Sequence, residues 1–170
     1  MKETNEDIES LQKLVNSSIE QAGIFLRSSF QMPEHSLSAR QLVRYLQGIK
    51  IVALATVTAQ GEPRVAPVGS IFYRGQFHIL SVAKAARARH IEKRSAISLA
   101  HFEGNDLAII VHGNGHILKP NHPDFAEIES IQKEVSGNSV QDWGEGVGVY
   151  IRVVANALYT FARYPQQMAE

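Results

Sequence analysis

Apolar residues near the amino terminus recur at steps of three and four positions, which is the spacing of one face of an amphipathic helix. The series consists of Ile8, Leu11, Val15, Ile19, Ala22, Phe25 and Leu26. The pattern predicts one helix that ends before Met32-Pro33 and packs on the domain or on a partner subunit. A second, short helix is expected between Ser38 and Gly48, because Ser38 and Gln41 have the spacing of a capping box.

After Gly48 the pattern changes to runs of β-branched and apolar residues that are separated by short turns, which is typical of antiparallel strands. The runs are 49–58, 63–73, 77–82, 96–102, 107–118, 149–153 and 157–161. Two helical stretches interrupt them, at 84–94 and from Phe125 to Val135, and a glycine-rich segment at 136–148 contains the single tryptophan, Trp143. Many short strands with few helices predict a small closed β-barrel with peripheral helices. We expect a helical extension at 1–35 and a barrel domain at 36–165.

Composition narrows the choice of protein class. The chain has 170 residues, 44% of them hydrophobic, and no cysteine, so we expect one globular domain without disulfides or thiolate metal ligands. The acidic, polar amino terminus does not have the features of a secretory signal, and no apolar run approaches about 18 residues. A cytoplasmic protein that does not insert into a membrane is therefore expected.

The formal net charge of zero hides an uneven distribution. Residues 1–35 carry −3, residues 36–94 carry +8 and residues 95–170 carry −5. Half of the central excess lies at 84–94, where five cations, Lys84, Arg87, Arg89, Lys93 and Arg94, accompany one acid. No aromatic residues alternate with these cations, as they do in many single-strand-binding surfaces, so nucleic acid is not the expected partner.

Two interpretations of this basic stretch remain open from the residues alone. It is either a solvated helix face or a phosphate site, since a helix that directly follows a strand offers free N–H groups and a positive dipole end. Ser81 lies just before the helix and adds a hydroxyl group. Arg64 begins a neighbouring antiparallel strand, which should bring it to the same end of the sheet.

From about Leu37 to Phe161 the order of these motifs resembles the pyridoxamine 5'-phosphate oxidase-like family of flavin-binding split barrels, which includes flavin and deazaflavin oxidoreductases. The resemblance is carried by IVALATVTAQGEPRVAPV, by ILSVAKAARARHIEKRSAISL and by VYIRV. It implies a six-stranded antiparallel split barrel with an added N-terminal helix. It also implies a homodimer that holds a flavin in the groove between two barrels.

The resemblance also assigns candidate cofactor-binding residues. Arg64, Ser81 and Arg87 match phosphate contacts of the family, and Lys84 lies one turn away. The strand residues Val65, Ala66, Pro67 and Val68 would run along the isoalloxazine ring, and Trp143 would cover the ring from the partner subunit or fill the core. Gly69, Ala85 and Ala86 stand where the authentic oxidase has phosphate ligands, and its C-terminal Arg-x-His substrate pair is missing. Oxidation of the vitamin is therefore not expected.

The predicted function is a flavin-type oxidoreductase that passes a hydride or electrons to a small organic substrate, with no assigned catalytic side chain. FMN and coenzyme F420 stand about equal as cofactors. The five cations suit a ligand with several negative charges, and the family's deazaflavin-using enzymes have a similar basic run. A haem-binding protein and a non-catalytic cofactor-binding or storage protein are the alternatives. The histidines at 101, 112 and 116 invite a metal site, but the sequence offers no acid at ligand spacing, so none is predicted.

Overall fold

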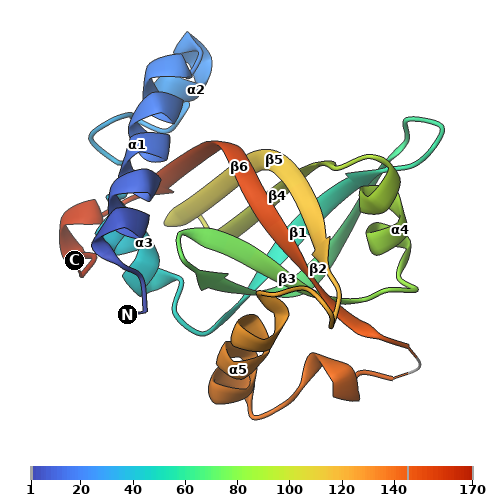
Figure 1. The fold of residues 1–170 in the computed structure, drawn as a ribbon. Coiled ribbons are helices and arrows are strands. Elements are labelled where there is room, and N and C mark those ends of the chain that lie inside the picture. The colour runs from blue at the N-terminus through green and yellow to red at the C-terminus, as the bar shows by residue number, and fades with distance from the viewer. Residues whose placement is uncertain (1, 145, 170) are drawn as a thin grey trace.

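The computed structural model describes residues 2–144 and 146–169, and a closed antiparallel barrel lies at its centre (Figure 1). Among these residues the strands are β1 (Ile49–Val57), β2 (Pro63–Tyr73), β3 (Gln76–Val82), β4 (Ala96–Glu103), β5 (Leu107–Leu118) and β6 (Gly148–Ala162). They follow the order β1-β2-β3-β6-β5-β4, and pairing of β4 with β1 closes the barrel. The predicted six-stranded antiparallel barrel is confirmed.

Helices surround the barrel and close its ends. They are α1 (Asn5–Gln21), α2 (Ile24–Ser29), α3 (Ala39–Tyr45), α4 (Ala86–Lys93) and α5 (Phe125–Ser136), with short 3-10 turns at Val140–Asp142 and Pro165–Gln167. The capping box that predicted α3 is present, because the Ser38 side chain accepts from the Gln41 N–H and the Gln41 side chain accepts from the Ser38 N–H. Within the described residues, no helix has both the length and the apolar character needed to cross a bilayer.

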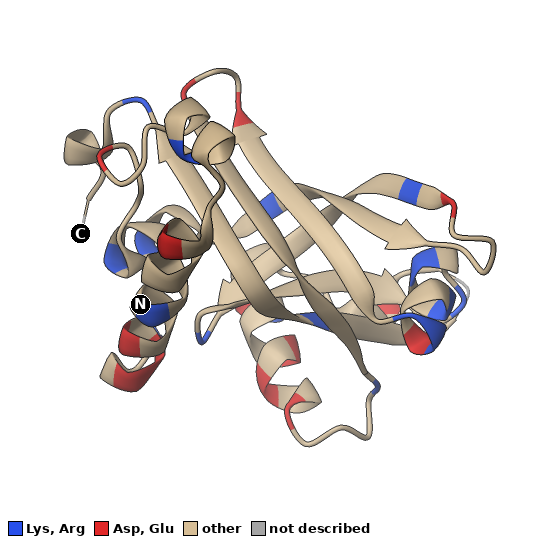
Figure 2. Cartoon of the chain, turned by 90° about the horizontal axis from the view of Figure 1, so that it is seen from above, with Lys and Arg blue, Asp and Glu red and all other residues tan. Residues whose placement is uncertain are grey.

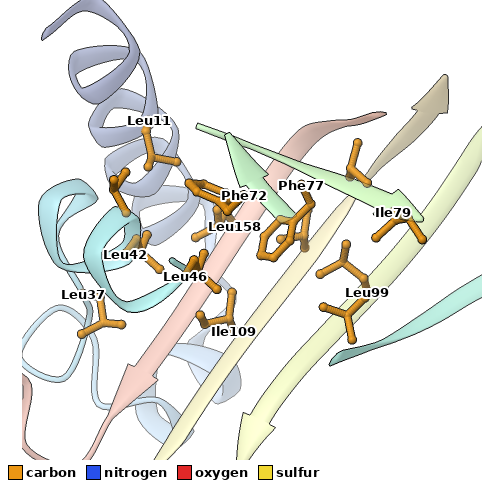
Figure 3. Close-up of a cluster of buried hydrophobic side chains, with 14 of the residues drawn as sticks. Leu11, Leu37, Leu42, Leu46, Phe72, Phe77, Ile79, Leu99, Ile109 and Leu158 are labelled. Carbon is orange, nitrogen blue, oxygen red and sulfur yellow. The ribbon is translucent and has the colours of Figure 1, made fainter. Parts of the chain in front are cut away.

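The main hydrophobic core joins the barrel interior to α1 and α3. Leu11 of α1, Leu42 of α3 and Leu46, the C-cap residue of α3, point toward Phe72 and Phe77 of the barrel (Figure 3). The hydroxyl of Ser18, buried on α1, accepts from the backbone N–H of Leu158 at 2.9 Å. Helix α1 therefore shares its core with the barrel, although it precedes the segment that carries the resemblance.

The N-terminal apolar stripe forms two helices, and the prediction of a single helix to Met32 was wrong. Ala22 has extended backbone (φ −62°, ψ 131°), and Gly23 begins α2 as its N-cap. From Ile8 to Ala22 the stripe is buried, except that Ile19 is half-buried, whereas Phe25 is 85% exposed. The break turns the second part of the stripe away from the barrel, because an extended residue changes the direction of the chain.

The last two predicted strands form one strand, β6, and the predicted break between them was also wrong. His112 of β5 pairs with Ala157, but the next residue, Gly113, pairs with Ala155, so Asn156 is an extra residue in the ladder. Such a bulge shifts by one position the alternation of inward- and outward-facing side chains, and the strand continues past it. The sequence pattern on either side of Asn156 is therefore out of phase, and it imitates two separate strands.

Candidate functional site

A pocket of about 290 Å³ lies where β1, the start of β2 and α4 meet. Leucine, valine and alanine side chains form most of its wall, and four polar side chains reach it. The lining residues are Leu54, Thr56, Arg64, Val65, Ala66, Ala86, Arg87 and His90. An apolar cleft with a few converging polar groups is the usual form of a small-molecule site.

Helix α4 holds the polar end of this pocket because one of its faces is anchored in the core. Ala88 and Ile91 are buried against the barrel. Arg87 and His90 lie three positions apart on the neighbouring face and both line the pocket. The N-cap residue, Ala85, offers no side-chain acceptor to the N–H groups of the first turn. This end of the pocket is therefore rich in hydrogen-bond donors.

Arg87 is the most unusual polar group in the pocket. Its Nε atom is buried and has no hydrogen-bond partner among the described residues, and within them its guanidinium group takes part in no ion pair. Burial lowers the pKa of the Arg87 side chain from its ordinary value, although an arginine stays charged in proteins. A partly desolvated cation without an anion is costly, so this arrangement favours an anionic ligand.

His90 and Thr56 form a second polar contact at the pocket, 2.9 Å apart between the ring Nδ1 and the hydroxyl oxygen. Sequence reasoning missed both residues. His90 could have been found from its position one helical turn after Arg87, whereas Thr56 depends on the packing of α4 against β1. The pair offers a hydroxyl and a ring nitrogen that can both contact a polar group of a ligand.

Arg64 stands at the mouth of the pocket with its side chain largely in solvent. Its guanidinium group donates to the carboxylate of Glu62 at 2.6 Å and to the carbonyl oxygen of Pro63 at 3.1 Å. Val65 is 71% exposed beside it, and Ala66 is half-buried. The structure therefore brings Arg64, Val65, Ala66 and Arg87 of the predicted set into one pocket.

The other predicted residues do not line this pocket in the single chain. Pro67 is exposed on the outside of the barrel, and the side chain of Val68 is buried inside it. Ser81 is 2% exposed and donates weakly to the carbonyl of Val82 at 3.5 Å. Lys84 is exposed, and Trp143 is 39% exposed at the end of the 3-10 turn. A role for these residues in cofactor binding stays a prediction.

A second hollow, of about 520 Å³, adjoins the pocket and shares Arg64 and His90 with it. Residues of the β1–β2 turn form one side, and the cations Arg89, Lys93 and Arg94 form the other. Lysines and arginines gather on and around α4, as Figure 2 shows. The acid of this helix, Glu92, pairs with Lys119 at 3.1 Å. The other acid that lines the hollow, Glu62, pairs with Arg64. The cations Arg89, Lys93 and Arg94 therefore leave the hollow with a positive character beside the apolar pocket.

Two of the three histidines considered for a metal site, His101 and His112, bond to other groups. His101 donates from Nδ1 to the carbonyl of Ile51 at 2.8 Å, and its Nε2 lies 2.7 Å from the Tyr45 hydroxyl. His112 lies 2.7 Å from the Ser98 hydroxyl. Across residues 2–144 and 146–169, no group of three or more potential ligands converges as a metal ion requires.

Comparison of the sequence with family models identifies the class of protein. The model described as pyridoxamine 5'-phosphate oxidase matches residues 39–153, which is more than half of the chain. The protein therefore belongs to this family, as its motifs indicated. No protein with a curated description matches the sequence significantly.

Solved structures of distant sequence share the fold. An FAD-binding protein from Mesorhizobium loti has a TM-score of 0.59 and 17% identity, over 74% of this chain and 93% of its own. An F420 reductase has a TM-score of 0.53 and 18% identity, over 66% and 91%. HutZ, the haem storage protein from Vibrio cholerae, has a TM-score of 0.55 and 15% identity, over 72% and 91%. At this identity the similarity shows the split-barrel fold alone.

Proposed function

We propose that the protein is an oxidoreductase that binds a phosphorylated flavin-type cofactor, FMN or F420, in the pocket between β1, β2 and α4. The observation that carries this proposal is the partly buried guanidinium group of Arg87, which has no partner among the described residues. A phosphate group beside it would accept from the guanidinium fork and from the N–H groups at the start of α4. The residues present therefore fit the phosphate end of such a cofactor.

The apolar part of the pocket suits a flat ring. Leu54, Val65 and Ala66 form a wall without charged groups, next to the phosphate end. Such a cofactor supplies the hydride or electron chemistry, while the protein binds it, orients it and excludes water. In this chain the contacts of Val65 and Ala66 would orient the ring, and the His90–Thr56 pair would hold a polar group between ring and phosphate.

The second wall of the groove comes, in this proposal, from another copy of the chain. Alternation along the strands points one set of residues outward, and from β2 through β1, β4 and β5 to residues 157–161 of β6 these residues carry no charge. One row consists of Pro67, Ala53, Ala100, Ile110 and Tyr159. Its neighbours are Val65, Ala55, Ser98, His112 and Ala157 on one side, and Phe102, Ala108 and Phe161 on the other.

We call these outward residues the apolar face, since all of them except Ser98, His112 and the hydroxyl of Tyr159 are apolar. An antiparallel barrel in water usually presents polar residues outward, so a face without charge supports burial against a partner. Val65 belongs both to the face and to the pocket, which places the pocket at its edge. A homodimer formed through this face would therefore cover the pocket. Ala100→Arg should yield a monomer in light scattering at micromolar concentration, together with weaker cofactor binding.

The basic hollow bears on the choice between the two cofactors. Arg89, Lys93 and Arg94 lie next to the pocket and suit a ligand that extends beyond its phosphate with further negative charge. This feature favours F420, which has an acidic tail, whereas the pocket around Arg87 suits the phosphate group of either cofactor. The substrate in either case is a small organic molecule that meets the exposed side of the ring.

The absorption spectrum of the purified protein, before and after incubation with each cofactor, tests the proposal. We expect stoichiometric uptake of FMN or F420, followed by reduction of the bound cofactor by a nicotinamide donor or a small reductant. Uptake of haem instead would replace the proposal with the haem-binding alternative. Uptake of none of the three would refute cofactor binding, and uptake without any electron transfer would support a storage protein.

A further inference from the structure

Helix α2 presents large apolar side chains to solvent. Ile24 is 90% exposed and Phe25 is 85% exposed, and these are the largest exposures among the big apolar residues described. The helix lies at the far end of α1, away from α5 (Figure 1). Two adjacent side chains of this size, left uncovered on a short helix, are typical of a surface that is buried in an assembly.

The position of α2 is fixed by bonds on both sides. Arg27 donates to the carbonyl oxygens of Ile19 and Glu20, at 2.7 and 3.1 Å, and so ties α2 to the end of α1. Downstream, the Nδ1 atom of His35 donates to the carbonyl of Ala162 on β6 at 2.8 Å. The exposed side chains are therefore held outward by the fold.

The exposed helix continues the apolar face of the barrel. Phe102 of β4 pairs with Ala108 of β5, which pairs with Phe161 of β6. The ring of Phe161 packs against two further rings, with its centroid 6.1 Å from that of Phe30 and 5.5 Å from that of His35. Phe30 is the C-cap residue of α2. An uncharged path therefore runs from the middle of the apolar face to the base of α2.

We propose that α2 is an intersubunit arm, whose Ile24 and Phe25 pack on the apolar face of a second copy of this chain. The inference rests on the homodimer proposed above and adds a contact to it. In a twofold dimer the same surface occurs on both subunits, so an arm at the rim of one apolar face reaches the rim of the other. The only charged residue of α2, Arg27, is already engaged, and nothing charged on the helix opposes burial.

The arm lies outside the segment that the family model matches, which begins at residue 39. The contact would therefore be a property of this chain added to the shared barrel. It would also explain why the helical stripe breaks at Gly23, since a straight helix would keep Phe25 in register with the stripe that α1 buries in its own subunit.

Photo-crosslinking tests the contact directly. The chain has no cysteine, so Phe25→Cys provides one attachment point for a thiol-reactive benzophenone. After irradiation of a mixture of ¹⁵N-labelled and unlabelled protein, we expect a covalent dimer that joins α2 of one subunit to strands of the apolar face of the other. Val135→Cys is the matched control, because Val135 is 41% exposed on α5, and it should give no covalent dimer.

The outcomes separate this inference from the proposed function. A dimer in light scattering with no intersubunit crosslink at Phe25→Cys would overturn the arm and leave the dimer and the cofactor site intact. A monomer in light scattering would overturn the dimer itself, and the arm with it. Sedimentation of the wild-type protein with phosphatidylglycerol vesicles, abolished by Phe25→Ser, would show a membrane contact and also overturn the arm.

The double variant Ile24→Ser/Phe25→Ser measures the strength of the contact. We expect its dimer dissociation constant to rise about 100-fold, with cofactor affinity unchanged at concentrations where the dimer persists. Its thermal unfolding as a monomer should match that of the wild type, because both side chains are exposed in the single chain. Val135→Ser should leave the dissociation constant unchanged, and an equal effect of both variants would contradict a specific contact.

Discussion

Replacement of Arg87 should separate ligand binding from protein stability. Among the described residues, its buried Nε atom has no hydrogen-bond partner and its guanidinium group forms no ion pair. Its removal breaks no ion pair with a described residue and ends the burial of a charge that lowers the pKa of Arg87. We therefore expect the free energy of unfolding of the unliganded protein to change by no more than about 1 kcal/mol. A bound phosphate would lose a charge-assisted contact that contributes about 1.5–3 kcal/mol.

This loss corresponds to a decrease in affinity of roughly 10- to 150-fold for Arg87→Ala, since 1.4 kcal/mol is about tenfold. Arg87→Glu should abolish measurable binding, because repulsion is added to the lost contact. Arg87→Lys keeps the charge without the guanidinium fork and should fall between the wild type and Arg87→Ala. Arg40→Glu makes the same change in net charge at an exposed site on α3 and is the matched control.

Fluorescence titration with FMN and with riboflavin, which lacks the phosphate, gives the decisive comparison. Arg87→Ala should weaken FMN binding and leave riboflavin binding unchanged, so that the preference of the wild type for FMN disappears. The phosphate assignment is wrong if both ligands lose affinity equally, or if neither does. A large decrease in the melting temperature of the unliganded variant would instead show that Arg87 has a structural partner.

Three further predictions concern the stability of the barrel and of the helix packed on it. Burial lowers the pKa of His78 from 6.5 to about 3. As pH decreases from about 6.5 toward 3, the unfolded chain takes up a proton at this residue before the folded protein does, so the free energy of unfolding should fall. Urea unfolding across this range should show a smaller fall for His78→Gln than for the wild type. A Cβ at Gly113 would overlap the carbonyl oxygen of Val154, so Gly113→Ala should lower the free energy of unfolding by about 1–3 kcal/mol. Tyr45→Phe removes the hydroxyl that donates to Glu103 at 2.6 Å and should cost about 1–2 kcal/mol in the same assay.

The barrel could be predicted because each strand carries its own local signal. Alternation along β1 to β5 and the turns between them are properties of consecutive residues. The errors fall where a single residue changes the geometry. Ala22 and Gly23 redirect a helix whose apolar spacing continues past them, and Asn156 shifts the phase of β6 without breaking it. The sequence around Ala22 and Gly23 does not show that the apolar spacing continues across a break between two helices. The sequence around Asn156 does not distinguish a bulge within one strand from the end of a strand.

The candidate site was predictable in part for the same reason. Arg87 and the strand from Arg64 to Ala66 belong to continuous motifs, and the barrel register brings the two motifs together. Thr56 enters the pocket only through the packing of α4 on β1, which no local pattern encodes. Ser81, Lys84 and Trp143 line no part of the pocket in one chain, so their roles depend on how a cofactor and a second subunit complete the groove.

The uneven charge of the chain has a structural counterpart at α4. Five of the ten cations of residues 36–94 lie at 84–94, whereas the outward residues of the apolar face carry no charge. These five gather on and next to α4, beside a pocket whose inner cation, Arg87, has no partner among the described residues. An uncharged face suits a second subunit, and a local excess of cations suits a small anion at the edge of that face. The two features therefore support one arrangement, in which dimer formation and cofactor binding use adjacent parts of the same surface and should depend on each other.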